Sequence, residues 1–130
     1  MQKEFKKHIL VVDDEAEFHF YVDAIFSGHP IKITNVFDGE EAISAIKREQ
    51  FDIILLDLLM PNASGGDFMR GIRSLSATLP PIIVISSIND IVLQEYCLNV
   101  GAVAYFNKPV DPDFLRTKIF ELIRLTPEVK

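Results

Sequence analysis

Several features that would place this sequence outside the class of ordinary globular domains are missing from it. A single cysteine, Cys97, excludes an internal disulfide, and the flanking VLQEYCLNV predicts a buried thiol on a helix face. No apolar run approaches the length of a membrane span, and the N-terminal MQKEFKKH lacks the hydrophobic centre of a signal peptide. Positive charge is also scarce, with 13 Lys and Arg against 19 Asp and Glu, a net charge of −6. These absences favour a cytoplasmic protein without membrane contact and without direct, non-specific binding to nucleic acid.

The length and the apolar content are those of one folded domain. The chain has 130 residues, 48% of them hydrophobic and 25% charged, which is enough for a core without cross-links. No linker, internal repeat or low-complexity tract interrupts it. We therefore expect residues 1–130 to form a single domain with a core over about residues 8–125.

Five short segments predict strands. Four of them are apolar on consecutive positions, which requires cover on both faces and is typical of a parallel sheet. Ile31–Asn35 instead alternates apolar and polar residues and predicts a half-exposed strand at the sheet edge. The five predicted strands are Ile9–Val12, Ile31–Asn35, Phe51–Asp57, Ile82–Ile85 and Val103–Phe106.

Helical segments alternate with these strands. Phe18, Val22 and Phe26 are four residues apart and should share one face of the first helix. Asp38 and Glu41 have the spacing of a capping box at the start of the second. The alternation predicts right-handed crossovers and an α/β fold with helices on both faces of the sheet. The predicted helices are Glu15–Phe26, one that begins after Asp38, Asp67–Leu75, one from Asn89-Asp90 to about Asn99, and one from Asp111-Pro112 to about Leu125.

Polar residues follow four of the five predicted strands. Asp13 and Asp14 follow the first, Asp57 ends the third, Ser86 follows the fourth, and Lys108 follows the fifth. In a parallel sheet these carboxyl ends meet at one edge, where ligands of open α/β sheets bind. Each residue alone also has a structural explanation, as a turn residue, a helix-terminal acid or a solvated lysine. The second strand contributes nothing comparable, as expected of an edge strand.

Three carboxylates at one edge repel one another, and one lysine cannot neutralise them. Either some carboxyl pKa values rise or a divalent cation binds. Oxygen ligands with free positions suit Mg²⁺. A cation, an ammonium and a hydroxyl around one carboxylate would also stabilise a transferring phosphoryl group. The residues therefore suggest Mg²⁺-dependent phosphoryl transfer onto Asp57 as the nucleophile.

Six pieces of sequence together resemble the response-regulator receiver domain, a CheY-like family phosphorylated by histidine kinases. They are LVVDDE, DGEEA, DIILLDLLMP, Gly65, PIIVIS and GAxxYxxKP, and they cover essentially the whole chain. The joint pattern is specific, whereas each piece alone is weak. The resemblance implies a flavodoxin-like, doubly wound five-stranded parallel sheet with strand order 2-1-3-4-5.

The resemblance also implies a role for each residue of the phosphoryl site. Asp57 matches the phosphoacceptor, and Asp13 and Asp14 match the acidic pair that holds Mg²⁺, with Asp14 as the more direct ligand. The main-chain carbonyl of Leu59 is expected to be another ligand. Lys108 should pair with the phosphoryl group.

A second group of positions matches the family's conformational switch. Ser86 takes the place of the switch hydroxyl, where threonine is commoner, and Tyr105 takes that of the switch aromatic. Lys108-Pro109 is expected to be cis. The face formed by the fourth helix, the fifth strand and the fifth helix should then change shape for a partner and is the candidate surface for a phosphorylation-dependent homodimer.

The expected partners are a histidine kinase or a histidine phosphotransfer protein on one side and a protein target or output domain on the other. A receiver phosphorylates and dephosphorylates its own aspartate and turns over no separate substrate. The chain is either a stand-alone receiver or a module excised from a hybrid kinase or larger regulator.

Two other classes fit parts of the pattern. A haloacid-dehalogenase-like phosphatase needs a second acid two residues after the nucleophile, where this chain has Leu59. A flavodoxin-type FMN carrier needs a hydroxyl- and glycine-rich loop after the first strand, where this chain has Asp13-Asp14-Glu15.

Overall fold

The chain folds as alternating strands and helices in this computed structural model, which describes residues 5–58, 69, 71–72, 74–75 and 79–124. The predicted elements within those residues are all present, with ends shifted by at most two residues. The predicted helix Asp67–Leu75 lies largely outside them, although Met69 and Ile72 are buried. The elements are β1 Lys7–Val12, α1 Ala16–Ile25, β2 Ile31–Val36, α2 Gly39–Arg48, β3 Ile53–Leu56, β4 Ile82–Ser86, α4 Ile91–Asn99, β5 Ala104–Asn107 and α5 Pro112–Ile123.

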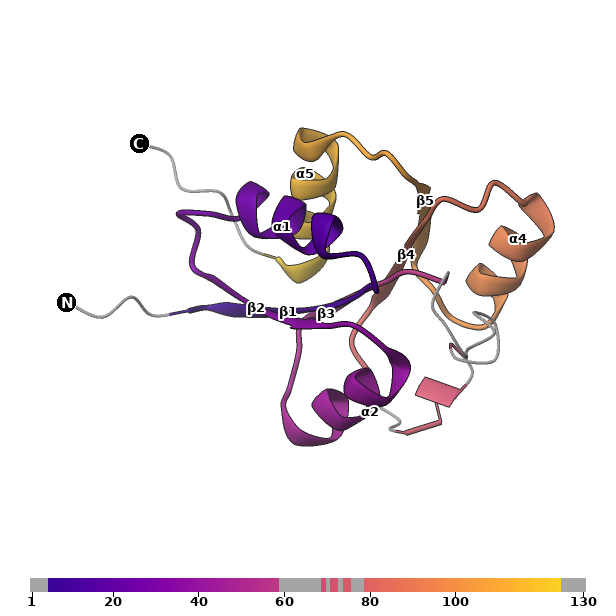
Figure 1. The fold of residues 1–130 in the computed structure, drawn as a ribbon, viewed down its shortest axis with the longest axis horizontal. Helices are drawn as coiled ribbons and strands as arrows, with labels where there is room; N and C mark the ends of the chain where they lie inside the picture. The colour runs from indigo at the N-terminus through magenta and orange to yellow at the C-terminus, as the bar shows by residue number, and fades with distance from the viewer. Residues whose placement is uncertain (1–4, 59–68, 70, 73, 76–78, 125–130) are drawn as a thin grey trace.

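All five strands form one parallel sheet with the order β2-β1-β3-β4-β5, as the family resemblance implied. The helices α1 and α5 lie together on one face of the sheet, and α2 lies on the other (Figure 1). The prediction of a single exposed edge strand was incomplete. A five-stranded open sheet has two edges, and β5 at the second edge is also only partly buried.

The sheet separates two hydrophobic clusters. Successive strand residues point to opposite faces, so Ile9 and Val11 pack against α1 and α5 while Leu10 and Val12 pack against α2 and α4. Cys97, as predicted, is a buried thiol in the second cluster. Within the described part of the chain, no helix is both long and apolar enough to cross a membrane.

Local polar contacts set the start of three helices. Asp38, Asp90 and Asp111 each accept a hydrogen bond from a backbone N–H in the first turn of α2, α4 and α5. The predicted capping box at α2 is altered in one detail. The Glu41 carboxylate accepts from the backbone N–H of Phe37, one residue before the cap.

Replacing Asp38 with alanine should reduce the free energy of unfolding by about 1 kcal/mol, because the Glu41 N–H loses its acceptor at 2.8 Å. Urea unfolding measures this change. The matched control is Ser44→Ala, at an exposed position of the same helix with no capping role, and it should change stability by about 0.5 kcal/mol or less. An equal effect of both substitutions would contradict the capping role.

Candidate functional site

The hydrogen-bond ladder of the sheet continues past the ends of the strands and fixes the polar residues there. The backbone N–H of Asp13 donates to Val36 of β2 at 3.2 Å, and that of Asp57 donates to Val12 of β1 at 2.9 Å. Lys108 is held in the same way by the Ser86 carbonyl of β4, at 2.9 Å. The predicted residues therefore meet at one edge because each is tied to the strand beside it.

The Lys108 ammonium forms ion pairs with three carboxylates. Lys108 Nζ lies 2.6 Å from Asp13 Oδ2, 3.3 Å from Glu15 Oε1 and 3.5 Å from Asp57 Oδ2. Asp13 is completely buried and Asp57 is 4% exposed, so both depend on this shared counter-charge. Glu15 was not among the predicted site residues, although it directly follows the acidic pair in the sequence.

The surroundings of Lys108 keep it protonated. Burial on its own lowers the pKa of this ammonium, but the hydrogen bond to Asp13 and the charge of Asp57 outweigh that effect, and the pKa of Lys108 is raised. The ammonium also lies 4.5 Å from the centroid of the Phe18 ring, a cation–π contact. Lys108-Pro109 is a cis peptide, as expected.

The acidic residues fit a hard divalent cation. Asp13, Asp14, Glu15 and Asp57 each place one carboxylate oxygen within 4.8 Å of the others. Two of them are buried and two are exposed, which leaves room for water and for phosphoryl oxygens on an ion held there. The predicted carbonyl ligand, Leu59, lies outside the described residues.

The two predicted switch residues both contact the backbone of one residue, Ile88, in the loop after β4. The buried Ser86 hydroxyl accepts from the Ile88 N–H at 3.1 Å, and the Tyr105 hydroxyl donates to the Ile88 carbonyl at 2.8 Å. The same carbonyl accepts a second bond, from Asn107 Nδ2 at 2.8 Å, which the sequence analysis missed. Tyr105 is buried, and burial raises the pKa of its phenol.

A further buried residue, His19, was also missed. Its ring lies between the Asp13 carbonyl, 2.7 Å from Nε2, and Asn35 Oδ1, 2.6 Å from Nδ1. The second strand thus contributes Asn35 to the far side of this ring, although the acidic cluster itself is formed by residues after β1 and β3. The helical spacing of His19, Val22 and Phe26 was the available signal for an inward-facing histidine.

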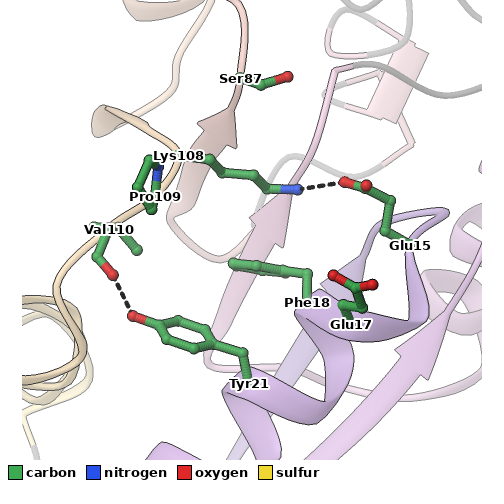
Figure 2. Close-up of a pocket in the computed structure, with 8 residues that line it drawn as sticks. All are labelled: Glu15, Glu17, Phe18, Tyr21, Ser87, Lys108, Pro109 and Val110. Atoms are coloured by element: carbon green, nitrogen blue, oxygen red, sulfur yellow. Dashed lines mark hydrogen bonds and ion pairs between the residues drawn. The ribbon is translucent and has the colours of Figure 1, made fainter.

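A groove of about 490 Å³ borders the site on the side of α1. Phe18 and Tyr21 of α1 form one wall, and Lys108, Pro109 and Val110 form the other (Figure 2). The Tyr21 hydroxyl donates to the Val110 carbonyl and joins the two walls. Lys108 thus lies at the junction of an open, mostly apolar groove and the acidic cluster.

Comparisons with known proteins agree with this fold. The family whose sequence model matches is the response regulator receiver domain, over residues 9–120. The probable transcriptional regulator ycf27 of Porphyridium aerugineum is 35% identical over 119 residues, which cover 92% of this chain and 49% of that protein. The chain belongs to the response regulator receiver family.

Solved structures agree in fold. The receiver domain of the Francisella response regulator 1452 is 26% identical, with a TM-score of 0.82 over 94% of this chain and 100% of that one. A two-component response regulator from Clostridium difficile superposes with a TM-score of 0.85 at 24% identity, covering 92% of this chain and 97% of that one. The chain spans about half the length of the curated relatives it matches.

The charged network makes a prediction about pH. Because the folded state raises the pKa of Lys108, its stabilising contribution is complete below the unfolded value near pH 10.4 and is lost as the pH rises through the folded value. Lys108→Met should therefore destabilise the fold by about 2 kcal/mol at pH 8 and by clearly less at pH 11. Urea unfolding of the wild type and the variant at the two pH values measures this difference. An equal loss of unfolding free energy at pH 8 and pH 11 would count against the network.

Proposed function

We propose that the chain is the phosphoacceptor receiver of a two-component phosphorelay and accepts a phosphoryl group on Asp57. The observation that carries this proposal is the Asp57 carboxylate at the end of the central strand, 3.5 Å from the Lys108 ammonium and within the four-carboxylate cluster. Asp57 is 4% exposed, and its backbone N–H is held by the Val12 carbonyl of β1. Family membership supports this reaction class, and the geometry supports the role proposed for each residue.

The proposed reaction is an in-line displacement at phosphorus. A carboxylate oxygen of Asp57 forms the new P–O bond, while the P–N bond to the donor histidine breaks and the leaving imidazole keeps that electron pair. The Lys108 ammonium lies where it can offset charge on the phosphoryl oxygens. Mg²⁺ bound by Asp13, Asp14 and Asp57, with the Leu59 carbonyl, would supply a second positive charge. Attack of water at phosphorus later restores the carboxylate, and no separate substrate is turned over.

The proposed output is a change in the loop after β4. A phosphoryl oxygen on Asp57 accepts from the Ser86 O–H and draws this side chain away from the Ile88 N–H, which otherwise donates to the Ser86 oxygen. The Ile88 backbone then loses the contact at its N–H, and the hydrogen bond from Tyr105 to the Ile88 carbonyl is rearranged. This alters the face formed by α4, β5 and α5, because α4 begins three residues after Ile88.

The proposed partners follow from this chemistry. A histidine kinase or a histidine phosphotransfer protein supplies the phosphoryl group, and a protein target or output domain reads the α4–β5–α5 face, which is also the surface for a homodimer. The net charge of −6 favours a protein over nucleic acid as the direct partner. Because the relatives are about twice as long, a receiver that forms part of a larger regulator fits as well as a stand-alone one in the cytoplasm.

Incubation with acetyl phosphate and Mg²⁺ should add one phosphoryl group to the protein, measured by intact mass. Asp57→Asn and an excess of EDTA should each abolish the adduct. The matched control is Asp52→Asn, which changes the aspartate that precedes the same strand and bonds to His8, away from the cluster. Persistence of the adduct in Asp57→Asn would overturn the assignment, and continuous hydrolysis without an adduct would favour a phosphatase.

Ser86→Ala should leave phosphorylation of Asp57 in place but remove its effect on the loop. Hydrogen exchange of the segment from Ser87 to Leu93 should change on phosphorylation in the wild type and change at least about threefold less in the variant. The matched control is Ser87→Ala, which removes the adjacent exposed hydroxyl. If both variants respond like the wild type, Ser86 does not link the phosphoryl group to the loop.

A further inference from the structure

His19 is a buried polar residue on a helix face that is otherwise apolar. Its side chain is 3% exposed, and its neighbours on the inward face of α1 include Val22 and Ile25. Burial of an imidazole is costly unless its nitrogens have hydrogen-bond partners. A polar atom lies within hydrogen-bond distance of each nitrogen here, at 2.6 Å from Nδ1 and 2.7 Å from Nε2. A leucine of similar size would pack on this face without that requirement.

The ring nitrogen Nε2 of His19 contacts the backbone carbonyl of Asp13, a member of the acidic cluster. A main-chain carbonyl only accepts, so His19 Nε2 donates to the Asp13 oxygen. Asn35 at the end of β2 holds the other side of the ring, and the Phe37 ring lies against it at 4.2 Å between centroids. The imidazole therefore joins the end of β1 to the end of β2 in a fixed orientation.

Every polar group of Asp13 has a hydrogen-bond partner. Its N–H donates to Val36, its carbonyl accepts from His19, and its Oδ1 accepts from the Glu15 N–H at 2.8 Å. The remaining oxygen, Oδ2, bonds to Lys108. The histidine fixes the peptide from which the Asp13 side chain projects, and the Asp13 carboxylate in turn places Lys108 beside Asp57.

We propose that His19 is a positioning residue for the phosphoryl site. By holding the Asp13 carbonyl against β2, it orients the Asp13 carboxylate toward the cation and toward Lys108. This inference rests on the proposed function, because it takes the acidic cluster to be the place where the cation and the phosphoryl group bind. The role resembles that of residues behind a metal ligand, whose loss typically costs 10–100-fold in metal affinity.

Three substitutions separate positioning from packing. His19→Leu keeps the volume and removes both hydrogen bonds, His19→Gln keeps an amide donor for the Asp13 carbonyl, and Asn35→Ala removes the outer anchor at a partly exposed position. Val22→Ala is the matched control, because it removes buried volume one turn along the same face of α1 without contact to the site.

The first measurement is hydrogen exchange in the metal-free protein. His19→Leu should speed the exchange of the Asp13 and Glu15 amides at least about tenfold, because the peptide between them is released. His19→Gln should recover part of the protection, and Asn35→Ala should show a smaller effect in the same direction. Val22→Ala should lower the melting temperature without selective loss of protection at these two amides.

The second measurement is the Mg²⁺ dissociation constant by calorimetry, together with the rate of adduct formation from acetyl phosphate. His19→Leu should weaken Mg²⁺ binding about tenfold and slow adduct formation. His19→Gln should restore part of both. If His19→Leu matches Val22→Ala in all three readouts, the histidine only packs the core and the inference is wrong. If the wild-type protein forms no adduct, the proposed function fails, whereas the exchange and Mg²⁺ results still decide whether His19 positions Asp13.

Discussion

A single ammonium group shared among buried carboxylates is the constraint on which the site depends. Two unit charges 4 Å apart interact by about 4 kcal/mol at the effective dielectric of a protein surface. Lys108 offsets only part of the repulsion among the four acids, and the remainder must be overcome by the packing of the sheet. The fold thus holds together a set of charges that would separate in an unfolded chain. The same excess of negative charge is what makes a cation favourable there.

The sheet accomplishes this through its parallel direction. Asp13, Asp57 and Lys108 lie far apart in sequence, yet each is the first or second residue beyond a strand and donates its backbone N–H to the neighbouring strand. The positions of these three residues relative to one another are therefore set by the register of the main-chain hydrogen bonds rather than by flexible side chains. Only the last contacts, between carboxylate oxygens and the ammonium, depend on rotamers.

The strands and most helices could be predicted because their apolar runs and caps are local signals. Asp38 and Asp111 marked helix starts, and the unbroken run before Asp57 marked a central strand. The order of the strands came from the family resemblance, since the residues alone gave only a parallel sheet. The positions of Asp13, Asp57, Ser86 and Lys108 followed from strand ends, although their roles stay proposals.

The contacts that the sequence did not reveal are those made between elements. Phe18, Val22 and Phe26 were predicted to share one face and do pack in one cluster, but the prediction omitted His19, which is buried on the same helix. Phe18 lies at the edge of this cluster, against Lys108. Asn107 likewise follows an ordinary strand pattern, and its bond to Ile88 depends on the path of a loop 19 residues away in sequence.

The division of the core by the sheet has an evolutionary consequence. His19 and Phe18 reach the site from the layer of α1 and α5, whereas Tyr105 packs with α4 in the other layer. Because the sheet separates these two buried clusters, a substitution in one of them need not disturb the packing of the other. Sequence change in one layer can therefore accumulate separately from change in the other, provided the residues along the strands keep their size.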